Sequence, residues 1–384
     1  MSMLYYLVLI VFGILFLIEI LFRINYKKKH GHHYHVSIKF PWKKSFITPH
    51  PFLSFAYKKN SVIDINQRLP YPLHYYKYYS FKEPIKINNI GHFGDDFTLS
   101  RKENVVKIAC LGDSVTANSY ADEVKDYSYP MLLEEVLNSK IETSKSKTRF
   151  DVYNCGIPGW VSADIVIDFI LNIIHTKPDY VILYHAFTDL HLYMTDSFEL
   201  DYSHGRYNLG EVIHLVKRAY FFPKIPFWHS YEYLKDKIVG TGNLRNDLST
   251  ILRKQRVSSS YNHSLEVEKN LLKNICIICR HYGINLILSS YAFYSYKDDP
   301  LTRRICEGVQ KENELLKELS EEFNIKFVDQ ANFIPHENEF FLDWIHLTPK
   351  GMELLSKKFA ENILEDFLEN YNNRNEFEKS IGKF

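Results

Sequence analysis

Short apolar runs alternate with helical patterns from residue 105 onward, and this alternation constrains the fold more than any other feature of the sequence. Strands are indicated at residues 105–111, 150–155, 180–184, 285–289 and 326–328. Helices are indicated at residues 128–139, 162–175, 264–281, 300–323 and from 349 to about 371. Because strands that alternate with helices form parallel sheets covered on both faces, we expect an α/β fold. Its core would be a three-layer α/β/α doubly wound sheet of about five parallel strands.

The rest of the chain is organised around this flavodoxin-like domain, which we expect to span residues 105–371. An aromatic and basic insertion at about residues 190–264 interrupts the alternation once, and a loop of that length is usually functional or a subdomain. Residues 41–104 are rich in Pro, Tyr and Lys with little periodicity, which predicts an irregular arm packed on the main domain. Residues 372–384 are expected to form a polar tail.

The N-terminal segment differs in kind from everything that follows. Residues 3–22 carry a single charge, Glu19, and at ~1.5 Å per residue a helix of this length would cross the ~30 Å hydrocarbon layer. The pattern predicts a retained single-pass transmembrane anchor at residues 1–24, with residues 3–22 in the lipid bilayer. A cleaved signal peptide is less favoured, because no basic residues precede the apolar stretch and no small-x-small site follows it. A basic and His-rich juxtamembrane linker, residues 25–40, is expected to be solvated rather than metal-bound.

The bulk composition excludes several function classes. With 47 basic and 46 acidic residues the net charge is +1, so no global field favours nucleic acid as a partner. Neither GxGxxG, nor a phosphate-binding Gly-rich loop, nor zinc-protease spacing is present, so we expect no cofactor and no metal. The five cysteines describe no disulfide framework. Cys276 and Cys279 lie on an apolar helix face, which favours a buried structural pair over a redox or metal site.

A serine and an Asp–His pair lie where ligands bind in this kind of sheet. Ser114 directly follows the first expected strand, and doubly wound sheets bind ligands beyond the carboxyl ends of their strands. Asp343 and His346 lie just before the last helix, whose start is indicated by Thr348 as N-cap and Pro349 as first helical residue. At this spacing Asp343 can accept the Nδ1 proton of His346. The Nε2 atom is then left to take the hydroxyl proton of Ser114.

Four stretches, taken in order, resemble the sequence blocks of the GDSL or SGNH serine hydrolases. They are Gly112-Asp113-Ser114 with Thr116, Asn154-Cys155-Gly156-Ile157-Pro158-Gly159, Ala186-Phe187-Thr188-Asp189, and Asp343-Trp344-Ile345-His346-Leu347-Thr348. Each block lies at or soon after the end of an expected strand, and the resemblance covers about residues 87–370. Residues 87–94 are similar to the lead-in of membrane-anchored bacterial members.

The resemblance implies a catalytic triad and an oxyanion hole. Ser114 would be the nucleophile, His346 the general base, and Asp343 the residue that orients the base. The oxyanion hole would be formed by the backbone N–H groups of Ser114 and Gly156 and by the side chain at position 188. Where the family has Asn, this chain has Thr188, whose hydroxyl reaches less far. Loss of one oxyanion donor typically costs about 10²- to 10³-fold in rate.

Other side chains near the expected site are candidates to contact the substrate. His185, Asn118 and Asn154 are candidates to compensate for the missing Asn. Trp160 and Trp344 flank the site and are candidates for stacking on a sugar ring, with ordinary packing as the alternative. The substrate-binding residues expected from the sequence are therefore Asn154, His185, Trp160 and Trp344.

The expected function is a membrane-anchored serine esterase that hydrolyses an acyl or acetyl ester. The resemblance implies that the ester is carried by a cell-envelope carbohydrate. Two alternatives remain open: an O-acyltransferase that uses the same site with a sugar acceptor, and a non-catalytic glycan-binding or scaffold member. We expect the catalytic body outside the cytoplasm, as in anchored relatives. The basic residues after the apolar segment favour the opposite side.

Overall fold

The computed structural model divides into two compact units, residues 1–45 with 211–254 and residues 46–210 with 255–384. The residues that the structure describes are 2–30, 47–48, 50–63, 85–98, 100, 103–118, 128–142, 147–193, 200–202, 230–231, 261–295 and 297–381. Most of the predicted linker at 25–40 and of the predicted insertion at 190–264 lies outside these ranges.

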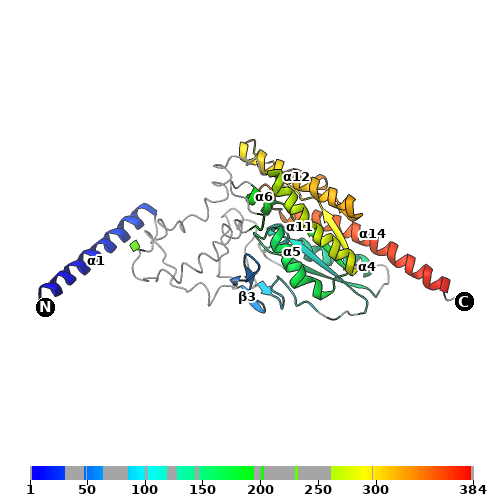
Figure 1. Ribbon diagram of the computed structural model, residues 1–384, viewed down its shortest axis with the longest axis horizontal. Helices are drawn as coiled ribbons and strands as arrows, with labels where there is room; N and C mark the ends of the chain where they lie inside the picture. Colours follow the sequence, from blue (N-terminus) through cyan, green and yellow to red (C-terminus); the bar gives the residue numbers. More distant parts are fainter. Residues whose placement is uncertain are drawn as a thin grey trace. The chain divides into compact units, whose positions relative to one another are not determined.

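Helix α1 (Ser2–His30) is the main described element of the first unit (Figure 1). Its Glu19 is only 7% exposed. The Glu19 carboxylate accepts hydrogen bonds from Arg23 Nε and from the N–H and hydroxyl of Ser230. Within the described part of the chain, no helix has the length and apolar character needed to cross a membrane. The segment 3–22 is helical, as expected. Its predicted role as a transmembrane anchor gains no support.

A five-stranded parallel sheet forms the centre of the second unit. Its strands are β5 (Val105–Gly112), β6 (Arg149–Gly156), β7 (Tyr180–Tyr184), β8 (Asn285–Ser289) and β9 (Lys326–Val328). They lie in the order β6-β5-β7-β8-β9 and are parallel throughout. This is the 2-1-3-4-5 order of flavodoxin-like sheets. The predicted fold class and all five predicted strands are confirmed.

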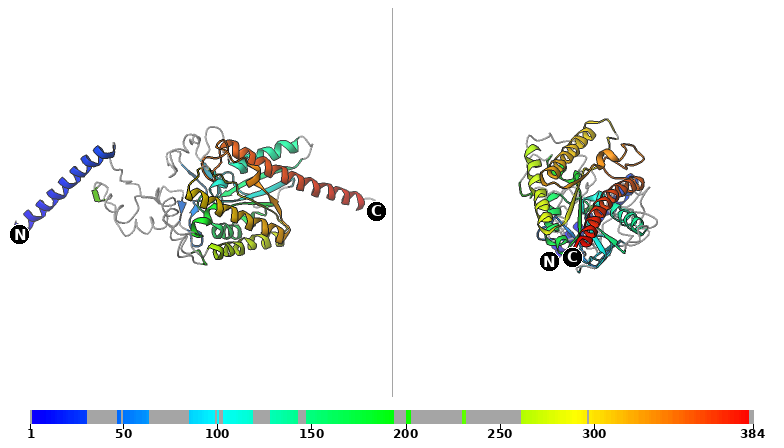
Figure 2. Two further views of the ribbon diagram at one scale, coloured as in Figure 1. Left: turned by 90° about the horizontal axis from the view of Figure 1, so that it is seen from above. Right: turned by 90° about the vertical axis from the view of Figure 1, so that its right-hand side faces the viewer.

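Helices cover both faces of this sheet (Figures 1 and 2). On one face, α4 (Tyr129–Glu142) packs against α14 (Pro349–Ile381). On the other face lie α5 (Ser162–Leu171), α11 (Tyr261–Tyr282) and α12 (Pro300–Phe323). Because side chains alternate along a strand, β5 buries Ala109 and Leu111 with α5 and α11 and turns Ile108 and Cys110 to the opposite face. Burial on both faces explains why the strands read as unbroken apolar runs.

Helix α14 is longer than the sequence predicted. It continues to Ile381, so that residues 372–381 of the expected polar tail are helical, and Figures 1 and 2 show its last turns extending beyond the sheet. The Arg, Glu and Lys residues in this part are good helix formers, so a polar composition does not end the helix.

The described part of the arm before β5 contains short antiparallel strands. β1 (Ile47–Thr48) pairs with β2 (Ala56–Tyr57), and β3 (Ser61–Ile63) pairs with β4 (Ile85–Ile87). An isolated bridge joins Phe93 to Asn154 of β6, and Phe55, Tyr57 and Phe97 are buried in the same hydrophobic core as the sheet. The arm is thus attached to the main domain through aromatic side chains.

Cys276 and Cys279 are free thiols on α11, buried in the core. Burial raises the pKa of Cys276 to about 12 and also raises the pKa of Cys279. Thiols held in their neutral form are poor nucleophiles and poor metal ligands. The pair therefore has the properties of the structural cysteines that the sequence favoured.

Candidate active site

Ser114 begins the short helix α3 (Ser114–Ala117), immediately after β5 and Asp113. Asp113 caps this helix, because its Oδ1 atom accepts the N–H of Val115 at 3.0 Å. Ser114 itself is partly exposed, while Asp113 is 1% exposed. The end of the strand therefore presents the serine hydroxyl at the carboxyl edge of the sheet and buries the aspartate behind it.

The side chains of Ser114, His346 and Asp343 form a continuous chain of hydrogen bonds. Ser114 Oγ lies 2.9 Å from His346 Nε2. His346 Nδ1 lies 2.9 Å from Asp343 Oδ2 and 3.1 Å from Asp343 Oδ1. The side chains of Asp343 and His346 are 18% and 17% exposed, so solvent reaches this part of the site. The fold thus brings together the three residues that the sequence singled out.

A hydrogen-bonded turn before α14 holds the Asp–His pair in place. Asp343 Oδ1 accepts the N–H groups of Ile345 at 3.0 Å and His346 at 2.8 Å. The N–H of Leu342 donates to the His346 carbonyl at 2.7 Å, which closes the turn. Thr348 then caps α14 as predicted, because its hydroxyl oxygen accepts the N–H of Gly351. The backbone N–H groups of this turn therefore hold the Asp343 carboxylate in the position from which it contacts the His346 imidazole.

The protonation of His346 follows from its surroundings. Burial lowers its pKa, but the charge and hydrogen bond of Asp343, with the charge of Asp113, outweigh burial and raise the pKa above its ordinary value. When the ring is neutral, the Nδ1 proton is donated to Asp343 and Nε2 accepts the Ser114 hydroxyl. The arrangement can therefore remove a proton from the serine once the pH is high enough to leave His346 neutral.

Gly156 is the last residue of β6 and does not have the oxyanion role that the sequence predicted, and Gly159 follows it in the next turn. The N–H of Gly156 donates to Asn154 Oδ1 at 3.0 Å, and a Cβ there would lie 2.3 Å from the nitrogen of Ala117. Gly156 thus allows α3 to approach β6 closely, and its N–H is not available to an oxyanion. Gly159 has φ +82° with open space where a Cβ would lie. Its N–H makes no hydrogen bond to any residue that the structure describes.

The predicted third oxyanion donor is also engaged elsewhere. Thr188 is 6% exposed, and its hydroxyl donates to Asp113 Oδ2 at 3.1 Å. A hydroxyl has a single proton, so Thr188 in this position has none left for a substrate oxygen. The Asn154 amide donates to the Ala117 carbonyl and accepts from Gly156, which corrects its predicted contact with substrate.

Two further residues that the sequence predicted to contact substrate are buried in the structure, and a third is half-buried. Trp160 is 2% exposed and donates its Nε1 proton to the Phe55 carbonyl at 3.1 Å, so it holds the arm rather than a sugar. His185 is 1% exposed and lies behind the nucleophile. Trp344 is half-buried, and its Nε1 donates to Thr302 Oγ1 at 3.1 Å. It lies in the sequence between Asp343 and His346, and its contact with substrate stays a prediction.

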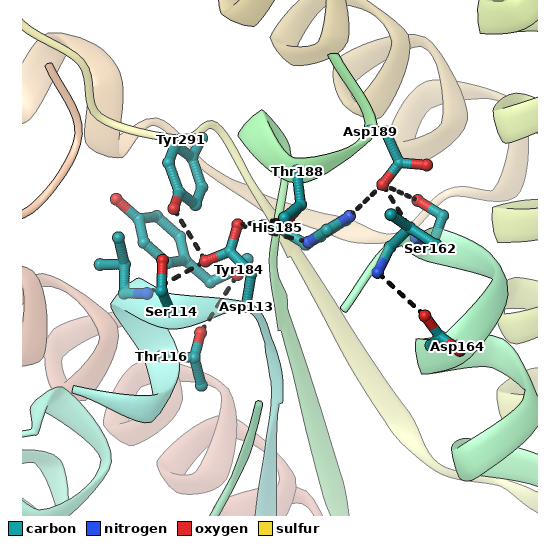
Figure 3. A network of polar contacts seen from close by, with 12 residues as sticks. Asp113, Ser114, Thr116, Ser162, Asp164, Tyr184, His185, Thr188, Asp189 and Tyr291 are labelled. Atoms are coloured by element: carbon teal, nitrogen blue, oxygen red, sulfur yellow. Dashed lines mark hydrogen bonds and ion pairs between the residues drawn. The ribbon is translucent and has the colours of Figure 1, made fainter. Parts of the chain in front are cut away.

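A buried polar network that the sequence did not predict lies behind Ser114 (Figure 3). Asp113 Oδ1 accepts the hydroxyl of Tyr291 at 2.8 Å, and Asp113 Oδ2 lies 3.5 Å from His185 Nδ1. His185 Nε2 lies 2.6 Å from Asp189 Oδ2. Asp189 belongs to helix α6 (Phe187–Tyr193). The only local signals were the i, i+4 spacing of the His–Asp pair and the place of Tyr291 soon after β8.

Part of this network has the residue types of a metal site. The ligand atoms of His185, Asp189 and Glu268 lie within 4.8 Å of one another, and all three residues are buried. A proton explains the shortest of these contacts, since 2.6 Å between a ring nitrogen and a carboxylate oxygen is a charge-assisted hydrogen bond. The Ser162 hydroxyl lies 3.1 Å from both Asp189 Oδ2 and Glu268 Oε1 and bridges the two carboxylates.

Comparison with known proteins adds a family match. The model of the GDSL-like Lipase/Acylhydrolase family matches residues 110–354, a stretch that contains Ser114, Asp343 and His346. None of the curated proteins matches the chain.

Similar solved structures include two acetyl xylan esterases. One matches at 13% identity and a TM-score of 0.40, over 67% of this chain and 100% of its own. The other, from Geobacillus stearothermophilus, matches at 15% identity and a TM-score of 0.40, over 67% and 94%. An alpha/beta hydrolase enzyme from the metagenome of Lake Arreo, Spain, also matches at 15% identity and a TM-score of 0.40, over 67% and 94%.

Proposed function

The chain belongs to the GDSL-like lipase/acylhydrolase family, and from this premise we propose that Ser114, His346 and Asp343 are the catalytic triad of a serine esterase. The family makes the protein an SGNH-type ester hydrolase. The observation that carries the triad is the hydrogen-bonded chain from Ser114 Oγ to His346 and on to Asp343, with 2.9 Å at each step. Partial exposure of all three side chains supports access by an ester.

The chemistry proceeds through an acyl-enzyme. Ser114 Oγ attacks the ester carbonyl carbon while His346 Nε2 takes the hydroxyl proton, and the carbonyl oxygen becomes an oxyanion. The oxyanion collapses, the bond to the leaving alcohol breaks, and His346 gives that alcohol its proton. Water then attacks the carbonyl carbon of acyl-Ser114 while His346 takes a water proton. The bond between that carbon and Ser114 Oγ breaks, His346 returns the proton to Oγ, and the carboxylic acid is released. Asp343 stays ionised and stabilises the imidazolium that forms in each step.

Backbone N–H groups supply the oxyanion hole in this proposal. The N–H groups of Ser114 and Gly159 donate no hydrogen bond to any described residue, which supports them as the two donors. Gly159 replaces Gly156 in this role, since the N–H of Gly156 is held by Asn154. Donors fixed by the backbone need no reorganisation when the negative charge develops.

The substrate is an acyl or acetyl ester, and the resemblance favours an ester on a cell-envelope carbohydrate. The membrane anchor and the extracytoplasmic location stay predictions from the sequence. Transfer of the acyl group to a sugar hydroxyl would use the same acyl-Ser114 and differs only in the acceptor.

The proposal is tested by measuring hydrolysis of p-nitrophenyl acetate by the full chain. Ser114→Ala and His346→Ala are expected to lower kcat by about 10³-fold or more, because nucleophile and base act as a unit. Ser139→Ala, at an exposed serine of α4, is the matched control and should leave kcat unchanged. Equal activity of the wild type and Ser114→Ala would contradict the triad. Adding a free sugar and finding its acyl ester would identify a transferase.

A further inference from the structure

A buried negative charge lies next to the proposed nucleophile. Asp113 is 1% exposed and accepts three hydrogen bonds, from Val115 N–H, Thr188 Oγ1 and Tyr291 OH. A carboxylate with three donors stays ionised even when buried. The charge of Asp113 acts on His346 and favours the protonated imidazole, which is the form that cannot take a proton from Ser114.

His185 lies directly behind this charge. Its Nδ1 faces Asp113 Oδ2 at 3.5 Å, and its Nε2 faces Asp189 Oδ2 at 2.6 Å. Nε2 is hydrogen-bonded to Asp189, whereas Nδ1 makes no hydrogen bond and is close enough to Asp113 only for an ion pair. Two carboxylates at these distances favour the charged imidazolium form of the ring. Burial lowers the pKa of His185, but the interactions of the ring with Asp113 and Asp189 outweigh burial and raise the pKa to about 10.

The surrounding helices hold this cation in place. Asp189, on α6, also accepts the N–H of Ser162 at 2.8 Å and the Ser162 hydroxyl at 3.1 Å, which fixes it to the start of α5. Glu268 of α11 contacts the same hydroxyl. Glu312 of α12 is 1% exposed, and burial together with the charges of Glu268, Asp189 and Asp113 raises its pKa well above the ordinary value. A neutral Glu312 adds no charge, and among the described residues of this network His185 is the cation that lies between Asp113 and Asp189.

We propose that His185 is a positioning residue of this esterase, whose imidazolium offsets the charge of Asp113 and thereby sets the pH at which His346 becomes an active base. The inference rests on the proposed triad. His185 never touches the ester; it acts through Asp113, which caps the helix that begins with Ser114. Without the cation, the unopposed Asp113 charge would hold His346 protonated to higher pH.

The first test needs no variant and reports the charge of His185 directly. In the wild-type full chain, with histidine labelled by ¹⁵N and assigned through the backbone, His185 should show two protonated ring nitrogens at every pH from 5 to 9. His346 should change protonation state within the same range. A His185 ring with one unprotonated nitrogen at pH 7 would overturn the proposal.

The second test reports the effect on the base. The rate at which a fluorophosphonate labels Ser114 is measured against pH for the wild type and His185→Asn. We expect the variant to be slower by about three- to tenfold at pH 6 and to recover to within about twofold at pH 9. The double variant Asp113→Asn with His185→Asn removes both charges and should restore the wild-type pH dependence. A purely structural role would slow labelling equally at every pH.

The outcomes separate this inference from the proposed function. A wild type that never labels would overturn the triad, and the inference with it. A wild type that labels, with the same pH dependence in His185→Asn, would overturn the inference alone. If His185→Asn does not fold, the protonation state of His185 measured in the wild type still decides whether the inference holds.

Discussion

Thr188 shows how one residue can keep its position and change its partner. It stands where the family resemblance leads one to expect an Asn that donates to the oxyanion, yet its hydroxyl donates to Asp113. The same aspartate accepts the hydroxyl of Tyr291 and faces His185, so Thr188 belongs to the group of residues that contact Asp113. At position 188 this chain thus has a hydroxyl that donates to Asp113, where the resemblance implies an amide that donates to the substrate.

Thr188→Val tests this change of partner. Valine keeps the shape and removes the hydroxyl, so Asp113 loses one of its donors and the free energy of unfolding should fall by about 1 kcal/mol. The expected fall in kcat/KM for p-nitrophenyl acetate is less than about tenfold, because no oxyanion donor is lost. A fall of about 10²- to 10³-fold, with stability unchanged, would show that the hydroxyl acts on the oxyanion instead.

At the scale of the elements, the sequence predicted what depends on local patterns. The five strands and the sites at their carboxyl ends follow from apolar runs and flanking residues, and the Asp343–His346 turn follows from its short spacing. Contacts between elements that are distant in the sequence could not be predicted, because no local sequence pattern indicates them. Nothing local indicated that the Trp160 ring bonds the Phe55 carbonyl, or that the N–H of Gly156 is held by a neighbouring side chain.

Trp160→Phe tests the assignment of this tryptophan to the attachment of the arm. The change leaves the Phe55 carbonyl without its buried donor, which costs about 1–3 kcal/mol in the free energy of unfolding measured with urea. KM for the ester should stay within about twofold of the wild type. Trp344→Phe, at a half-buried position beside the triad, is the matched control and should destabilise the fold less. A raised KM in Trp160→Phe at unchanged stability would return this residue to the substrate site.

At the scale of the whole molecule, a net charge of +1 hides a strongly charged interior. The sheet edge buries Asp113, His185 and Asp189 side by side, and His185 stabilises the two carboxylates only while its ring is charged. The stability of the second unit should therefore depend on pH even though the charges of the whole chain nearly cancel.

The direction of this dependence follows from His185. Its pKa is raised from an ordinary 6.5 to about 10 in the folded chain, so its contribution to stability is complete below pH 6.5 and is lost as the pH rises toward 10. We expect the Tm of the wild type to fall across this interval, and the fall to be smaller in His185→Asn. Equal slopes of Tm against pH in the two proteins would contradict a charged His185 in the folded state.

The central claim is that Ser114 is an activated nucleophile, and labelling of the full chain with a fluorophosphonate tests it most directly. Peptide mass spectrometry should place the label on Ser114 alone, and labelling should be lost in both Ser114→Ala and His346→Ala. A folded wild-type chain that takes up no label, or that is labelled at another serine, would contradict the account and favour the non-catalytic reading.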